Sequence, residues 1–460
     1  MQRINAIVSL TWKAAFRYRL FWVLALLLVG AVVGLPLLIK DDGTARGFTQ
    51  ILLTYTLSAI TALLGIATLW LACGTLARDI EDAQIQMVAV KPIARWQIWI
   101  GKWLGILSLN ALLLAMAGGS VYCLLQWRAN RLSPGQQKVL RNEVLVARAS
   151  VKEILPDFRE AVEAELQRRL QKSSINPTNI PDIRKQLEAQ IKAGIQSVRA
   201  DGYRPWRIDL GRAKDSLRDQ PLFLRVKFFT AQNNPSGTFI GLWQVGNPET
   251  KRVWRSEPMS LAPETFHEFP IPPNLFDENG ILDVVFGNAN QETLLFPLED
   301  GLEVLYRESS FGVNFIRGLG IIFFWLALLA ALGLAAASFL SFPVAAFVSI
   351  AVLLIGLSSG TLASVVQEGT ILGVDHESGA KVSSSVLDLV MVPVFRAMLK
   401  VINLVQNFSP IDSLSTGRSI TWTTLALAGV QIVLFLGGIL AAIGIYTFSR
   451  RELATAQGNS

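Results

Sequence analysis

Between Gly318 and Val366 the chain carries no charged residue. A helix of about 20 apolar residues crosses the hydrocarbon core of a bilayer, so this run is long enough for two crossings. Its best turn is Ser341-Phe342-Pro343, because a proline is tolerated at the start of a helix but not inside one. We therefore predict two membrane spans, at 318–339 and 344–366, joined by a tight turn that has no basic residue of its own.

Four other apolar runs have a similar length, which raises the predicted number of spans to six. They lie at 20–39, 51–76, 103–127 and 422–448. Charged residues make up 17% of the chain, whereas a soluble domain carries about 25%. The predicted fold class is an α-helical polytopic membrane protein. Residues 20–127 would hold spans one to three, residues 316–366 spans four and five, and residues 421–448 span six.

Basic residues near the predicted spans indicate the orientation of the chain. Residues 1–19 carry four basic residues, no acid and an apolar face at helical spacing, which predicts an amphipathic helix on the membrane surface. A cleaved signal peptide is the alternative, but the apolar run that follows is too long for one. Segment 77–102 and the tail 449–460 are also basic. Because cytoplasmic flanks are rich in Lys and Arg, we place both termini in the cytoplasm. These flanks also explain the net charge of +7 without nucleic acid as a partner.

Residues 128–315 form a large hydrophilic insert, which this orientation places outside the cytoplasm. The part at 128–202 has apolar residues at helical spacing, including Val144, Leu145, Ala149 and Ile154, and this predicts two or three helices with one helical hairpin. The part at 203–315 alternates strand-like runs with turn residues, which favours a β-sandwich. The predicted strands are 222–229, 239–245, 252–255, 266–271, 282–286 and 293–296.

Residues 367–420 return to the outer side in this topology. Within them 386–408 is apolar and amphipathic, but Asp388, Arg396 and Lys400 interrupt it. Charged residues are costly at the centre of a bilayer. We therefore expect an interfacial or re-entrant helix. A seventh span is the alternative, and it would put the C-terminus outside.

Sequence motifs for catalysis are missing. The chain has no Gly-x-x-x-x-Gly-Lys-Ser/Thr loop, no Gly-x-Ser-x-Gly and no His-Glu-x-x-His, so a P-loop ATPase and the common hydrolases are excluded. Asp375, His376 and Glu377 are adjacent and do not converge easily on one metal ion, so no metal site is predicted.

Three tryptophans of the outer insert have two interpretations. Trp206, Trp243 and Trp254 can stack on a sugar or another ligand. Aromatic residues of a β-sandwich are more often core residues.

The charged segment 77–102 lies between two predicted spans. Helical spacing places Ile80, Ala83 and Met87 on one face of a short helix, and Asp79, Asp82 and Gln86 on the other. Such a helix can dock into a groove of a soluble partner. Pro92 would end it, while Arg95 and Lys102 would meet lipid phosphates. The alternative is an ordinary charged loop that only anchors two spans.

The order of residues in this segment resembles the permease subunits of type-2 ATP-binding-cassette (ABC) exporters. The similarity rests on Glu81, on Lys-Pro-x-x-Arg at 91–95, and on Gly101-Lys102 at the start of the next span. The basic surface helix, the six spans and Ser-Pro-Ile-Asp at 409–412 before the last span agree with it. Two features depart from the family, namely Ala83-Gln84 in place of a Gly-Thr-like pair and the much larger outer insert.

The resemblance implies a transporter subunit of a bacterial plasma membrane that is not itself an enzyme. The chain would bind no cofactor, since ATP and Mg²⁺ would sit on a separate ABC ATPase subunit. A second copy of the permease or a related permease would complete the pathway, and the insert would contact an extracytoplasmic protein. The residues that would contact the ATPase are Asp79, Ile80, Glu81, Asp82, Gln84 and Met87. The residues that would anchor the segment in the membrane are Lys91, Pro92, Arg95, Gly101 and Lys102. A membrane-anchored binding or scaffold protein, without transport, is the alternative function.

Overall fold

The chain divides into two compact units in the computed structural model. A helical unit comprises Met1–Ala147 and Ser309–Ser460, and a β unit comprises Arg148–Glu308. The structure describes residues 2–17, 19–38, 44–82, 93–155, 157–172, 180–230, 237–247, 252–371 and 386–451. The β unit is shorter than the predicted insert of 128–315, because the chain on both sides of it belongs to the helical unit.

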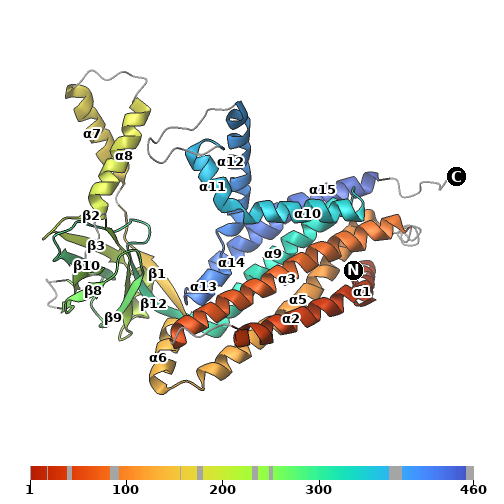
Figure 1. The fold of residues 1–460 in the computed structure, drawn as a ribbon, viewed down its shortest axis with the longest axis horizontal. Coiled ribbons are helices and arrows are strands. Elements are labelled where there is room, and N and C mark those ends of the chain that lie inside the picture. The colour runs from red at the N-terminus through yellow and green to blue at the C-terminus, as the bar shows by residue number, and fades with distance from the viewer. Residues whose placement is uncertain are drawn as a thin grey trace. The chain divides into compact units, whose positions relative to one another are not determined.

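Long helices make up most of the helical unit (Figure 1). Its described elements are α1 (Gln2–Arg17), α2 (Arg19–Leu38), α3 (Ala45–Glu81), α5 (Arg95–Ala129), α6 (Pro134–Glu143), α9 (Phe311–Ala337), α10 (Phe342–Leu357), α11 (Ser359–Glu368), α12 (Val386–Gln406), α13 (Pro410–Ser415), α14 (Trp422–Ala428), the π-helix η4 (Gly429–Gly437) and α15 (Gly438–Arg450).

Four described helices are long and apolar enough to cross a membrane: Gly47–Glu81, Arg95–Ala129, Phe311–Ala337 and Trp422–Arg450. They coincide with four of the predicted spans. The first predicted span lies in α2, where Trp22–Leu35 is a shorter apolar helix. The helix α12, at the predicted interfacial segment, is not among the four.

The fifth predicted span is not one straight helix, which corrects the sequence prediction. Its two parts, α10 and α11, are bent by 57° at their junction. The junction holds a Ser-Ser-Gly sequence at 358–360, and the Ser358 hydroxyl donates to the carbonyl of Leu354 at 3.0 Å. Serine side chains that bond to the backbone of the preceding turn often bend helices.

Small residues bring α3, α5 and α9 together. A Cβ added to Gly333 of α9 would lie 2.7 Å from the Cβ of Ala72 in α3, and one added to Gly118 of α5 would lie 2.6 Å from Leu319 of α9. Glycine at such positions lets helix backbones approach closely. The three helices therefore form the centre of the helical unit, around buried residues such as Leu64 and Ile322.

The β unit contains two larger sheets and a small one. Its strands are β1 (Val146–Lys152), β2 (Ser197–Val198), β3 (Tyr203–Asp209), β4 (Leu222–Val226), β5 (Phe229–Thr230), β6 (Phe239–Val245), β7 (Trp254–Arg255), β8 (Met259–Leu261), β9 (His267–Ile271), β10 (Ile281–Asn288), β11 (Leu294–Leu295) and β12 (Leu302–Ser310). The first sheet has the order β1-β12-β4-β9. The second has the order β3-β10-β6-β7, with β8 also on β6, and the third has the order β2-β11-β5.

Alternating burial along the strands makes the β unit a sandwich. The pattern is exposed–buried in β3 and intermediate–buried in β10, as expected when one face of a sheet packs on a core. One core cluster contains residues from both larger sheets, including Leu224 of β4 and Val284 of β10. The predicted β-rich region is confirmed, and β6 has the predicted bounds.

The predicted helical hairpin is formed by α7 (Phe158–Lys172) and α8 (Ile180–Gln196), which pack through Val162, Leu166 and Leu187 (Figure 1). The prediction of helix at 144–154 is wrong, because strand β1 occupies Val146–Lys152. Apolar residues there match helical spacing in part, but pairing with β12 from the far end of the β unit decides the structure. Such long-range pairing overrides local preference.

Candidate functional site

The candidate site is the end of the helical unit where α3 stops and α5 starts. The helix α3 ends at Glu81, with Asp82 exposed at its C-cap, and α5 begins at Arg95. The predicted contact and anchor residues Gln84, Met87, Lys91 and Pro92 lie outside the described residues. Arg78, Asp79, Glu81, Arg95 and Lys102, with Arg451, are called the charged junction below.

Asp79 and Lys102 join α3 to α5 inside the junction. The Lys102 Nζ lies 2.5 Å from the Asp79 Oδ2 and 2.7 Å from the carbonyl of Thr75. The sequence predicted that Lys102 would meet lipid phosphates, but the residue is 7% exposed and its ammonium group binds α3 instead. A buried ammonium group must be paired, and these two oxygens of α3 supply the partners.

Glu81 joins α3 to the start of α10. Its Oε1 accepts from the backbone N–H of Phe342 at 2.8 Å. Phe342 is the first residue of α10, whose N-cap Ser341 makes no side-chain cap. A carboxylate stabilises this end because helix N-termini have free N–H groups and a positive partial charge. The Arg78 guanidinium lies 4.3 Å from the centre of the Phe342 ring, which adds a second contact between the same two helices.

Arg95 joins the start of α5 to the end of α15. Its Nη1 lies 2.9 Å from the carbonyl of Phe448, 2.8 Å from that of Ser449 and 2.7 Å from that of Arg451. Arg451 in turn donates to the carbonyl of Ser338 at 3.3 Å, at the C-cap of α9. Cations are stabilising at helix C-termini. Both arginines therefore bind protein carbonyls, where the sequence predicted that Arg95 would bind lipid.

Gly101 is part of a crossing between α5 and the N-terminal helix. A Cβ at Gly101 would lie 2.8 Å from Ile7, and one at Gly105 would lie 2.7 Å from Thr11. The Trp12 Nε1 donates to the Ser108 hydroxyl at 2.7 Å on the same side. Glycines four residues apart let two helices cross closely. The predicted surface helix α1 thus packs on α5 through its apolar face, next to the junction.

Three predicted contact residues, Ile80, Glu81 and Asp82, differ in exposure. Ile80 is half-buried against the apolar cluster beneath the junction, so it contributes to packing. Asp82 and Glu81 are exposed. The described part of segment 77–102 therefore presents an acidic end at Glu81 and Asp82.

The three tryptophans of the β unit lie in or against its core. Trp206 is 3% and Trp243 2% exposed, and their ring centres are 6.0 Å apart. Trp254 is half-buried with its ring 6.3 Å from that of Phe269. The rings of Trp206 and Trp243 have no exposed face for a ligand, which favours the interpretation as core residues.

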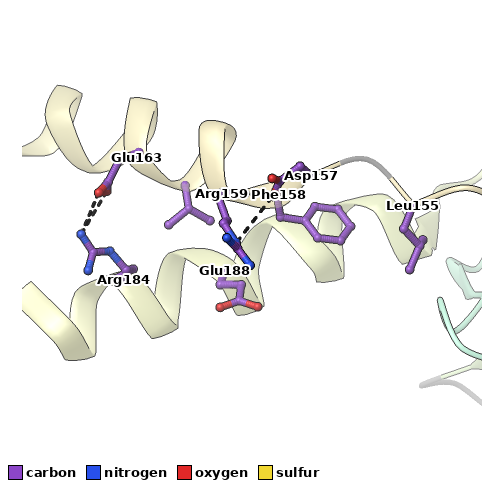
Figure 2. A pocket seen from close by; sticks show the side chains of 8 residues that line it. Leu155, Asp157, Phe158, Arg159, Glu163, Arg184 and Glu188 are labelled. Carbon is purple, nitrogen blue, oxygen red and sulfur yellow. Dashed lines mark hydrogen bonds and ion pairs between the residues drawn. The ribbon is translucent and has the colours of Figure 1, made fainter.

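A hollow of about 640 Å³ lies between α7 and α8 (Figure 2). Figure 2 shows Glu163 and Arg184 pointing toward each other across it, with a closest N···O distance of 2.7 Å. Both side chains are 51% exposed, and exposed ion pairs contribute little energy. Among the described residues no group of three or more His, Cys, Asp or Glu can hold a metal ion. Asp375, His376 and Glu377 lie outside them.

Buried charges of the β unit were not predicted from the sequence. Arg148 pairs with Glu268, and Arg225 pairs with Glu303, which is 1% exposed. Arg204 lies 3.3 Å from Glu153. Burial raises the pKa of Glu153, while Arg204 opposes that rise. The Arg225–Glu303 pair joins the adjacent strands β4 and β12, while Arg148 of β1 and Glu268 of β9 come from opposite edges of the same sheet. Strand register and order cannot be read from one sequence with no turn to fix them.

No family model matches this chain, and neither do the curated proteins or the solved structures with which it was compared.

We predict that the Asp79–Lys102 pair stabilises the junction. Asp79→Asn leaves the Lys102 ammonium buried without its counterion, at a cost of about 1–3 kcal/mol, so the melting temperature in detergent should fall. Lys102→Met together with Asp79→Asn removes both charges and should recover part of the loss. Equal melting temperatures for wild type and Asp79→Asn would contradict the pairing.

We predict that α1 depends on the two glycines of α5. Gly101→Ala or Gly105→Ala places a methyl group against Ile7 or Thr11, which should cost about 1–3 kcal/mol by overpacking and expose α1 to limited proteolysis. Gly119→Ala is the matched control on the same helix, because nothing lies within 4 Å of a Cβ there. If all three variants are cleaved alike, the crossing is wrong.

Proposed function

We propose that this chain is the membrane-spanning permease subunit of an ABC exporter, which couples ATP hydrolysis on a separate ATPase subunit to substrate movement. The observation that carries the proposal is the charged junction. The predicted coupling segment leaves α3 directly after Glu81 and re-enters the helical unit at Arg95, and both residues hold the ends of other helices. A push on the segment would therefore act on several helices at once.

The route of that push follows the hydrogen bonds. Through Glu81 it would reach the start of α10, and through Arg95 the end of α15. Through Arg451 it would reach the end of α9. ATP-driven closure of the partner would thus move spans against one another, which is how rigid elements carry a switching transition. The chemistry, with ATP and Mg²⁺, belongs to the partner subunit.

Six spans fit the same proposal. They would be α2, α3, α5, α9, the bent pair of α10 and α11, and the continuous helix from α14 through η4 to α15. The end of α3, the start of α5, the α9–α10 turn and the end of α15 meet at the charged junction. The α9–α10 turn has no basic residue of its own, but Arg78 contacts Phe342 and Arg451 contacts Ser338 at its two sides. A basic junction of this kind is expected on the cytoplasmic side.

The remaining parts of the proposal concern partners and place. We expect a bacterial plasma membrane, both termini in the cytoplasm, and a second copy of the permease or a related permease. The β unit would stand outside the cytoplasm as a docking surface for another protein. The second candidate function is a membrane-anchored binding or scaffold protein. The β unit, with its own core, favours that candidate only if no ATPase associates with the chain.

Photo-crosslinking from the coupling segment tests the proposal. A photoreactive amino acid at Gln84 or Met87 of the full chain, in its native membrane, should capture a nucleotide-binding subunit. The matched control is the same amino acid at Asn130, at the opposite end of α5, and it should capture none. If no nucleotide-binding protein is captured at either position, the scaffold function replaces the exporter.

Asp82 offers a test that leaves the fold intact. It is exposed at the C-cap of α3, so Asp82→Lys should change the free energy of unfolding by no more than about 0.5 kcal/mol. It should still reduce co-isolation of the ATPase subunit several-fold, because charge reversal at an interface disfavours the partner. Unchanged co-isolation would remove Asp82 from the contact surface.

A further inference from the structure

The last apolar helix contains a π-helix of nine residues, η4, between α14 and α15. In a π-helix each N–H bonds to the carbonyl five residues back, so the segment holds more residues per turn than an α-helix. Such segments are rare and short, and they are frequent at functional sites. The sequence does not predict it, because a continuous apolar run does not distinguish the two helix types.

The spacing of the buried residues along this helix shows that the π-helix adds one residue to the turn. The buried positions are Ala428, Ile432, Gly437, Gly444 and Phe448. The step from Ile432 to Gly437 is five residues, one longer than the steps from Ala428 to Ile432 and from Gly444 to Phe448. In an uninterrupted α-helix the inward positions after Ile432 would fall one residue earlier. Ile443 would then take the place of Gly444, since each residue turns the helix by about 100°.

Gly444 shows why this shift matters. A Cβ there would lie 2.8 Å from the Trp99 Nε1 and 3.0 Å from the Cα of Ala335. An isoleucine cannot enter that space. The α15 helix can therefore pack on α5 and α9 only while η4 keeps its π geometry, and a change of η4 to α geometry must move α15 away from them.

Two residues of α5, Arg95 and Trp99, hold α15 in its packed position. Arg95 binds the last carbonyls of α15, and Trp99, four residues on, contacts Gly444. Residues four apart lie on one face of a helix, so the same face of α5 makes both contacts with α15. Within the described residues the buried Trp99 Nε1 has no hydrogen-bond partner. A buried donor without a partner costs free energy, which lowers the barrier to releasing this contact.

We propose that η4 is a register switch in the last apolar helix. In the packed state η4 is π-helical and Gly444 faces Trp99. In the released state η4 is α-helical, α15 is rotated by about 100°, and it has left α5 and α9. Arg95 links this switch to the coupling segment, and that role rests on the proposed function. The switch itself is a property of this chain alone.

A one-residue deletion within η4 isolates the switch. Deleting the exposed Leu434 lets the segment become α-helical while Gly444 and Phe448 still face inward. The matched control deletes the exposed Tyr446, between Gly444 and Phe448, so that neither π nor α geometry of η4 can turn both residues inward. The melting temperature should stay near wild type for the first deletion and fall for the second. Equal losses in the two variants would overturn the register assignment.

Hydrogen exchange measures the motion in the purified full chain in lipid nanodiscs, without nucleotide or partner. Amides of Gly429–Gly437 should exchange at least about tenfold faster than those in the middle of α9, because the segment opens locally. Deletion of Leu434 should slow them to the rate of α9, since one register remains. Slow exchange in the wild type, or no effect of the deletion, would overturn the switch. Because no partner is present, this result is independent of the crosslinking test of function.

Discussion

Hydrogen bonds from charged side chains to helix ends hold the helical unit together at one end. Every helix leaves four N–H groups and four carbonyls without an internal partner at its ends, and such groups are costly away from water. Glu81 binds the first turn of α10, and Arg95 binds the last turn of α15. Arg451 binds the end of α9, and Lys102 binds Asp79. Small residues such as Gly118 and Gly333 add close packing along α3, α5 and α9.

This arrangement gives the functional proposal its physical basis. The chain lacks the sequence motifs of a nucleotide hydrolase, and its described residues form no metal cluster. Its charged residues bind helix ends, which is suited to transmitting movement. The register of α15 depends on η4, and the end of α15 depends on Arg95. A contact of the ATPase with the coupling segment would then be transmitted through Arg95 to α15 and would change the register of the last helix.

The sequence predicted what depends on local pattern and missed what depends on distant partners. Hydropathy located the long helices, and alternation located β6 and β10, because both signals are confined to short windows. Strand β1 was predicted as helix because its partner β12 lies far along the chain. The sequence singled out Arg95, Gly101 and Lys102 as membrane anchors, and in the structure their contacts are with α15, α1 and α3. A pattern of charges does not distinguish a lipid phosphate from a helix C-terminus, since both attract a cation. The Gly-x-x-x-Gly spacing at 101–105 was the one signal that could have revealed the α1 crossing.

The central claim is that movement at the coupling segment reaches the last helix through Arg95. Spin labels at the exposed residues Phe339 and Tyr446 report the separation of the end of α9 from α15 in the full complex. We expect addition of ATP to change the label–label distance in the wild type and to leave it unchanged in Arg95→Gln. The same ATP-dependent change in both proteins would contradict the account, because the movement would then reach α15 without Arg95.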